Sequence, residues 1–183
     1  MKLKDDNKKY GTLSKILHWG IGLAVIGLFA LGYWMRTLDY YSSWYQKAPH
    51  LHESVGLLLI LLVPVMILWR LRNRNPSNDH LKPFEKLSAG LMKKALYAAM
   101  LAILVRGYLI SSAGDTSIEL FNWFDVPAIF TVNESKVLIG NLHQYFAYFI
   151  MGLVALHALA ALKHHYIDKD STLKRMLPFI NIK

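Results

Sequence analysis

The sequence contains no cysteine among its 183 residues. Disulfides, catalytic thiolates and iron–sulfur clusters are therefore excluded, and so is haem attached through thioether bonds, because each of these requires a cysteine sulfur. Because no disulfide can form, the composition does not indicate whether the chain works in an oxidising or a reducing compartment.

Acidic residues are also scarce: 12 Asp and Glu stand against 21 Lys and Arg, which gives a formal net charge of +9. Such a charge can indicate nucleic-acid binding, but here most of the basic residues lie in polar segments between long apolar stretches. The first of these segments, residues 1–15, holds five lysines and lacks the small-residue cleavage site of a signal peptide. We therefore expect it to be a cytoplasmic tail of the mature protein.

Four apolar stretches approach the ~20 residues that a helix needs to cross a bilayer. They cover about residues 16–35, 52–69, 88–110 and 142–162. The third is the least apolar because it carries Lys93, Lys94 and Arg106, and Pro64 is expected to kink the second. The sequence thus predicts one domain over residues 1–183, an all-α membrane bundle of four helices.

Lys and Arg are distributed unequally between the two sides of such a bundle. The N-terminal tail, the linker 70–94 and the C-terminal tail from residue 163 together hold seventeen, whereas the opposite side holds four. By the positive-inside rule, this excess places both termini in the cytoplasm.

The connection over residues 111–141, on the outer side, is long for a segment without structure, so we expect it to be partly ordered. Four aromatic side chains suit a position among lipid headgroups: Phe121, Trp123, Phe124 and Phe130. We interpret this segment as an interfacial lid without chemistry of its own.

Four of the eight histidines lie within or at the ends of the apolar stretches, where an ionisable side chain is costly and is a candidate for function. His143 and His157 are fourteen residues apart, which separates them by about 21 Å along a helix and leaves them only about 40° out of phase. His52 begins the second stretch on the outer side, and His18 lies near the cytoplasmic start of the first. Each histidine of the fourth stretch therefore has a partner at its own depth.

Two such pairs predict two b-type haems in the core of the bundle, one between His52 and His143 and one between His18 and His157. Several glycines leave room for close helix packing or for a flat macrocycle: Gly20, Gly22, Gly27, Gly56 and Gly152. A metal transporter is the alternative, but it would be expected to carry acidic residues within the span. Glu53 is the only carboxylate near a helix interior.

The other histidines carry less information. His50 lies two residues before His52 and is the alternative outer ligand, although it falls in the preceding loop. His164 and His165 are either solvated interfacial residues or donors near a quinone or a haem propionate. His80, in a polar linker, is expected at the surface.

These motifs resemble the prokaryotic cytochrome b561 family over nearly the whole chain. The matching segments are residues 16–19 (ILHW), 52–56 (HESVG), the spacing of His143 and His157, and residues 163–166, 170–173 and 175–178. The resemblance implies a di-haem electron carrier of the bacterial inner membrane that exchanges electrons with ubiquinone. It also implies that His18, His52, His143 and His157 are the axial ligands of the haem irons.

Two functions are compatible with this resemblance. One is the oxidation of superoxide at the outer face with delivery of electrons to ubiquinone, an activity of the family. The other is a membrane anchor that carries electrons from a periplasmic redox partner. The outer side has four basic and six acidic residues, which counts modestly against an anionic substrate, although Arg36, Lys47 and Arg106 can still form a local positive funnel.

Arg106 is the one charge near the end of an otherwise apolar run, and it departs from the uncharged stretch that the family has there. We expect it to pair with a propionate of the outer haem or to reach outward to a lipid phosphate, because an unpaired charge in hydrocarbon is costly.

Overall fold

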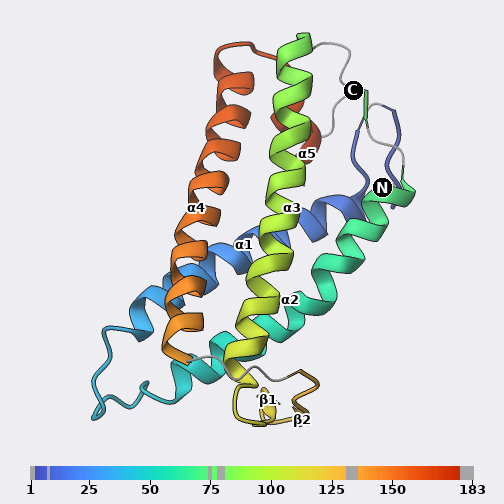
Figure 1. The fold of residues 1–183 in the computed structure, drawn as a ribbon. Coiled ribbons are helices and arrows are strands. Elements are labelled where there is room, and N and C mark those ends of the chain that lie inside the picture. The colour runs from blue at the N-terminus through green and yellow to red at the C-terminus, as the bar shows by residue number, and fades with distance from the viewer. Residues whose placement is uncertain (1–2, 8, 74–75, 78–80, 131–135, 178–183) are drawn as a thin grey trace.

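The computed structural model describes residues 3–177 except residues 8, 74–75, 78–80 and 131–135 (Figure 1). Four long helices form the body of the molecule: α1 (Thr12–Met35), α2 (Lys47–Arg72), α3 (Pro83–Ser111) and α4 (Lys136–Tyr166). Each holds an apolar window long enough to cross a membrane, and only 6–22% of each window is buried inside the protein. The prediction of a helical membrane bundle is thereby confirmed, with side chains that face lipid over most of each helix.

Each helix extends beyond its predicted apolar stretch by up to about two turns. In α3 the extra residues form a polar first turn, where Glu85 accepts a hydrogen bond from the Lys82 backbone amide, as in a capping box. Helix α2 continues without a break through Pro64. The start of α3 is therefore set by local capping.

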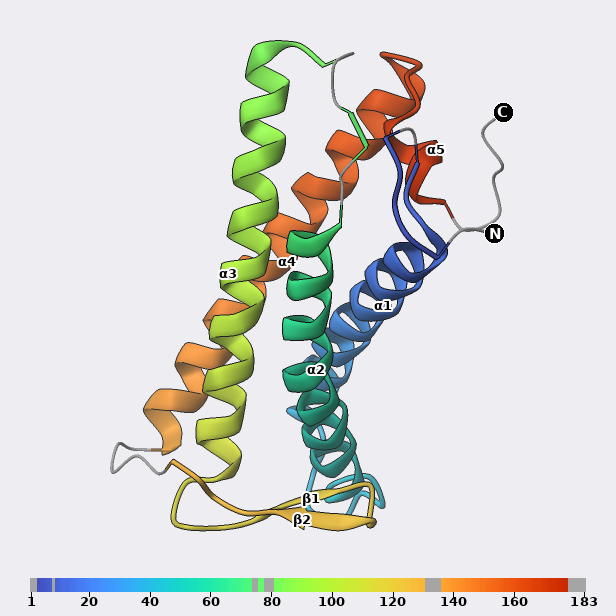
Figure 2. The ribbon, with the colours of Figure 1, turned by 90° about the vertical axis from the view of Figure 1, so that its right-hand side faces the viewer.

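The helices pack in chain order, α1 on α2, α2 on α3 and α3 on α4, and α1 and α4 touch over a shorter stretch. In Figure 1, α3 and α4 stand upright while α1 and α2 cross behind them at an incline; Figure 2 shows the bundle from the side. A buried cluster joins α1, α2 and α3: Ile21, Leu59, Val63 and Met66, with Tyr97, Met100 and Leu104 packed against it.

The two ends of the bundle differ. One end, which we call the terminal end, holds the start of α1, the end of α4 and the short helix α5 (Thr172–Met176). There Asp5 accepts hydrogen bonds from Gly11 and Ser14 and pairs with Arg70 at 2.9 Å. This network ties the N-terminal segment to both α1 and α2.

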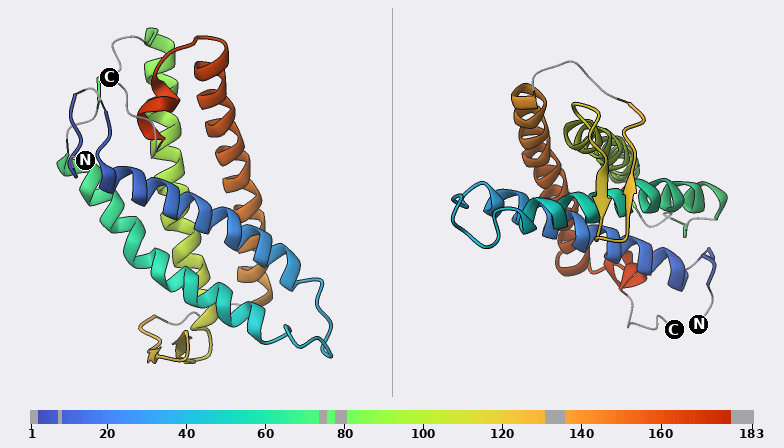
Figure 3. Two further views of the ribbon diagram at one scale, coloured as in Figure 1. Left: turned by 180° about the vertical axis from the view of Figure 1, so that it is seen from behind. Right: turned by 90° about the horizontal axis from the view of Figure 1, so that it is seen from below.

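The opposite end, which we call the hairpin end, carries a two-stranded antiparallel hairpin, β1 (Ile118–Leu120) and β2 (Phe124–Val126). It lies across the ends of the helices (Figure 3, right). The fully buried hydroxyl of Ser54 on α2 donates to the Glu119 carbonyl and accepts from the Phe121 amide. The expectation of partial order in this connection is confirmed, but strands were not predicted.

Aromatic side chains of the hairpin segment point outward. Trp123 is 73% exposed and Phe130 is 69% exposed. Exposure of this kind suits a segment among lipid headgroups, and the interpretation as an interfacial lid stays a prediction.

Candidate functional site

The hairpin end brings His52 of α2 and His143 of α4 face to face. Their ring centroids lie 6.3 Å apart, with the ring planes at 71°. Both rings border a cavity of about 440 Å³ that is lined by residues of all four long helices, a volume in the range of cofactor pockets.

The terminal end holds the second pair. The ring centroids of His18 on α1 and His157 on α4 lie 6.1 Å apart, with the planes at 66°. The four histidines therefore meet in the two pairs that the sequence predicts, one near each end of the bundle.

The spacing in both pairs fits an iron atom held between two imidazoles. An imidazole nitrogen lies about 1.1 Å from the ring centre and binds a metal at ~2.0–2.1 Å, so two rings on opposite sides of one metal are roughly 6.2–6.4 Å apart. The observed separations of 6.3 and 6.1 Å agree with this value. The separations also lie within the range of edge-to-face ring contacts, so they are compatible with a shared metal ligand without requiring one.

Glycines of neighbouring helices position the two rings at the hairpin end. A Cβ atom at Gly32 of α1 would lie 3.1 Å from Cε1 of His52, and one at Gly107 of α3 would lie 3.3 Å from Cε1 of His143. The Cε1–Nδ1 edge of each ring faces the neighbouring glycine, with Nδ1 at 3.6 Å from the Gly32 position in His52 and at 3.8 Å from the Gly107 position in His143. Nε2, on the other side of each ring, is then the nitrogen left to bind a group in the cavity.

Gly32 and Gly107 were missed by the sequence analysis, which singled out five other glycines. A Cβ atom at any of those five would meet no atom within 4 Å, so close packing of protein helices does not explain them. Gly56 borders the cavity and leaves space there, as expected for room beside a macrocycle.

Arg106 lies half-buried on α3, one residue before Gly107. Its guanidinium carbon is 5.7 Å from the ring centre of Phe146, a cation–π geometry. Among the residues that the structure describes, no carboxylate pairs with it, and its predicted pairing with a propionate stays a prediction.

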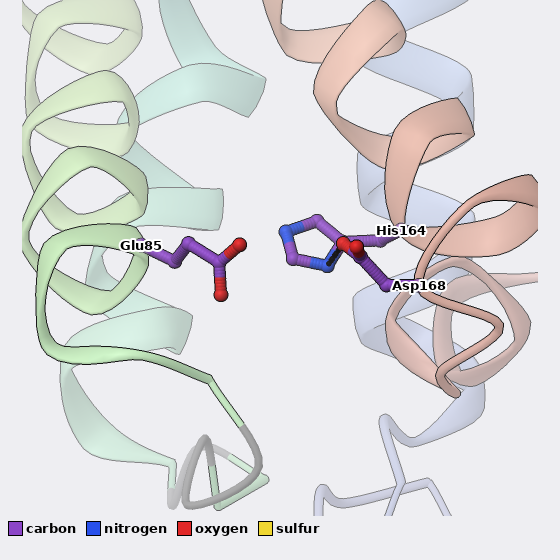
Figure 4. A group of neighbouring side chains, drawn as sticks. All are labelled: Glu85, His164 and Asp168. Atoms are coloured by element: carbon purple, nitrogen blue, oxygen red, sulfur yellow. Dashed lines mark ion pairs between the residues drawn. The ribbon is translucent and has the colours of Figure 1, made fainter.

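His164 belongs to an ion-pair cluster at the terminal end. Its Nδ1 lies 2.7 Å from Oδ2 of Asp170 and 3.0 Å from Oδ2 of Asp168, and Glu85 faces it from α3 (Figure 4). Glu85, His164 and Asp168 are close enough to hold a metal ion. However, the Lys163 ammonium already lies 2.7 Å from both Glu85 and Asp168, so the cluster is held by an internal cation.

Asp170, which lies beyond the end of α4, is part of the same cluster. Burial by itself would raise the pKa of its carboxyl, but hydrogen bonds from Thr172 and His164 outweigh burial and hold the pKa below its usual value. The cluster thus favours the ionised carboxylate, which fixes the turn between α4 and α5.

The remaining predicted residues lie elsewhere. His165 packs its ring on Tyr166 at 4.8 Å between centroids, and its role near a quinone or propionate stays a prediction. His50 turns to the hairpin, with Nε2 at 3.8 Å from the Glu119 carboxylate, whereas His52 is the residue that faces His143. His80 lies outside the described residues.

Comparison with known proteins agrees with this arrangement. Residues 9–179 match the family model described as prokaryotic cytochrome b561. The chain is 42% identical to cytochrome b561 homolog 2 of Escherichia coli K12 over 97% of its own length and 95% of that protein. It is 31% identical to cytochrome b561 homolog 1 of the same organism (88% and 93%) and 30% identical to the probable superoxide oxidase CybB of Yersinia pestis (94% and 97%).

Proposed function

Because the chain belongs to the prokaryotic cytochrome b561 family, whose members transfer electrons in bacterial membranes, we propose that its two histidine pairs each bind one haem b. The observation that carries the proposal is the separation of the rings, 6.3 and 6.1 Å, which leaves space for one iron in each pair. The haem supplies one-electron chemistry when it is bound. The chain itself orients the imidazoles and keeps the redox centres out of water.

The two pairs form a path along the bundle. His143 and His157 on α4 differ by fourteen positions, which corresponds to about 21 Å, so the path covers much of a hydrocarbon core of ~30 Å. We place the hairpin end outside and the terminal end in the cytoplasm, on the Lys and Arg distribution.

Ubiquinone is the proposed electron acceptor, and an outer-side donor is the proposed source. Superoxide is the first candidate donor, supported by the name of the Yersinia pestis relative and by Arg36 at the border of the cavity. A periplasmic redox protein is the second candidate. It is favoured by the acidic residues Asp115, Glu119 and Asp125 around the hairpin, which repel an anion.

Haem content tests the ligand assignment. Purified protein should show the reduced spectrum of low-spin haem b and about two haems per chain. His18→Ala or His157→Ala should remove or perturb one haem, and His52→Ala or His143→Ala the other. His50→Ala is the matched control and should keep both, because His50 faces Glu119; normal haem content in all four ligand variants would refute the assignment.

The donor is tested separately with the oxidised protein. Haem reduction by enzymatically generated superoxide, followed by electron delivery to a soluble quinone, would support the first candidate. If superoxide reduces the haems no faster than it reduces free haem in detergent, the protein donor is the better hypothesis.

A further inference from the structure

The helices α3 and α4 run antiparallel in a constant register. At the terminal end, Glu85 of α3 pairs with Lys163 of α4 at 2.7 Å. At the hairpin end, Gly107 of α3 lies against His143 of α4. A residue n on α3 is therefore level with residue 250 − n on α4, to within two residues, along the whole length of the pair.

By this register, Lys93 on α3 lies level with His157 on α4. Lys93 precedes Gly107 by fourteen residues on α3, just as His157 follows His143 by fourteen residues on α4. Fourteen residues return a helix to nearly the same face, so Lys93 lies on nearly the same face of α3 as Gly107 and at the level of His157. The Lys93 charge is also close enough to act electrostatically on His157.

The two pairs thus differ at one equivalent position. At the hairpin end the position is a glycine, and the neighbouring Arg106, whose guanidinium carbon lies 5.7 Å from the ring centre of Phe146, acts electrostatically on His143. At the terminal end the same position is a lysine. Lys93 is half-buried, and no carboxylate pairs with it in the part of the chain that the structure describes.

Other charges also lie near the two pairs. Arg70, the second cation near His18, has its own counter-ion because Asp5 lies 2.9 Å from it. At the hairpin end a carboxylate, Glu53, directly follows His52 and accepts a hydrogen bond from Ser111. Lys93 is therefore the cation near His157 that no carboxylate of the described residues neutralises, as Arg106 is near His143.

We propose that Lys93 raises the reduction potential of the haem held by His18 and His157. Reduction adds one electron to the site and breaks no bond, and a cation in a medium of low dielectric constant favours the reduced form. The inference rests on the proposed function and names a residue that tunes one of its two haems.

Redox titration of the purified protein, followed by the absorbance of each haem, tests the role of Lys93. Lys93→Met should lower the midpoint potential of the terminal-end haem, identified as the one that His157→Ala removes, and leave the other midpoint unchanged. Lys93→Arg keeps the positive charge and should leave the midpoint of the terminal-end haem at its value in the unaltered protein. The matched control is Lys94→Met, which removes the same charge from the exposed neighbouring position and should shift neither midpoint.

Equal midpoints in Lys93→Met, Lys94→Met and the unaltered protein would overturn the inference. Loss of the terminal-end haem in both Lys93→Met and Lys93→Gln, but not in Lys93→Arg, would also overturn it and make Lys93 a structural anchor. Failure of the proposed function has a different result, because His157→Ala would then leave the haem content unchanged.

Discussion

Replacing Gly32 by alanine should weaken haem binding at the hairpin end selectively. The new Cβ would lie 3.1 Å from Cε1 of His52, whereas ordinary carbon contacts begin at about 3.5 Å, so the imidazole must move by about 0.4 Å. Metal–ligand distances tolerate only ~0.2 Å. Loss of positional support of this kind typically costs about 10–100-fold in affinity, which corresponds to about 1.4–2.8 kcal/mol.

Gly27→Ala is the matched control, because a Cβ at Gly27 of the same helix meets no atom within 4 Å. Both substitutions increase helix propensity by about 1 kcal/mol, so that effect cancels in the comparison. Titration of the apoprotein with haem, together with the haem content after purification, measures the difference. Equal affinities of the Gly32→Ala and Gly27→Ala proteins for the hairpin-end haem would refute the reasoning, because the contact would then not constrain His52.

Three further predictions concern the ends of the bundle. Arg106→Gln should lower the midpoint potential of the hairpin-end haem and leave the other nearly fixed; a redox titration in which neither midpoint moves would make Arg106 a headgroup anchor only. Because the pKa of Asp170 is lowered in the folded protein, its stabilising effect is complete above the pKa of the unfolded chain and is lost as the pH falls through the folded pKa. Thermal unfolding from pH 7 to pH 3 should therefore show a smaller acid-induced loss of stability in Asp170→Asn than in the unaltered protein, and parallel curves would contradict this. A His164→Ala/His165→Ala double variant should reoxidise its haems more slowly with a soluble quinone if these residues bind it, and an unchanged stopped-flow rate would remove them from the path.

The four helices and both histidine pairs were predictable because they depend on properties of a single helix. Apolar length indicates each span, and the fourteen-residue spacing of His143 and His157 follows from helical periodicity alone. Their pairing with His52 and His18 then needs only the alternation of the helices across the membrane.

Features that depend on how the helices cross could not be predicted in this way. The roles of Gly32 and Gly107 follow from which helix faces each imidazole, and no local pattern encodes that choice. The hairpin has strands of only three residues, too short for a periodic signal, and it depends on hydrogen bonds to Ser54 of α2. His164 is held by carboxylates that lie beyond the end of its helix. Its position along α4 therefore did not indicate that it would form these ion pairs.

The constant register of α3 and α4 restricts how the gene can change in length. A one-residue insertion or deletion between Glu85 and Gly107 would shift one end of α3 by about 1.5 Å and 100° relative to α4. Either the Glu85–Lys163 pair or the contact of Gly107 with His143 would then be lost. The same holds for α4 between His143 and Lys163. Gaps in alignments of relatives that keep these contacts should therefore fall in the connection between the two helices, where added residues lengthen a loop and leave both histidine pairs at their depths.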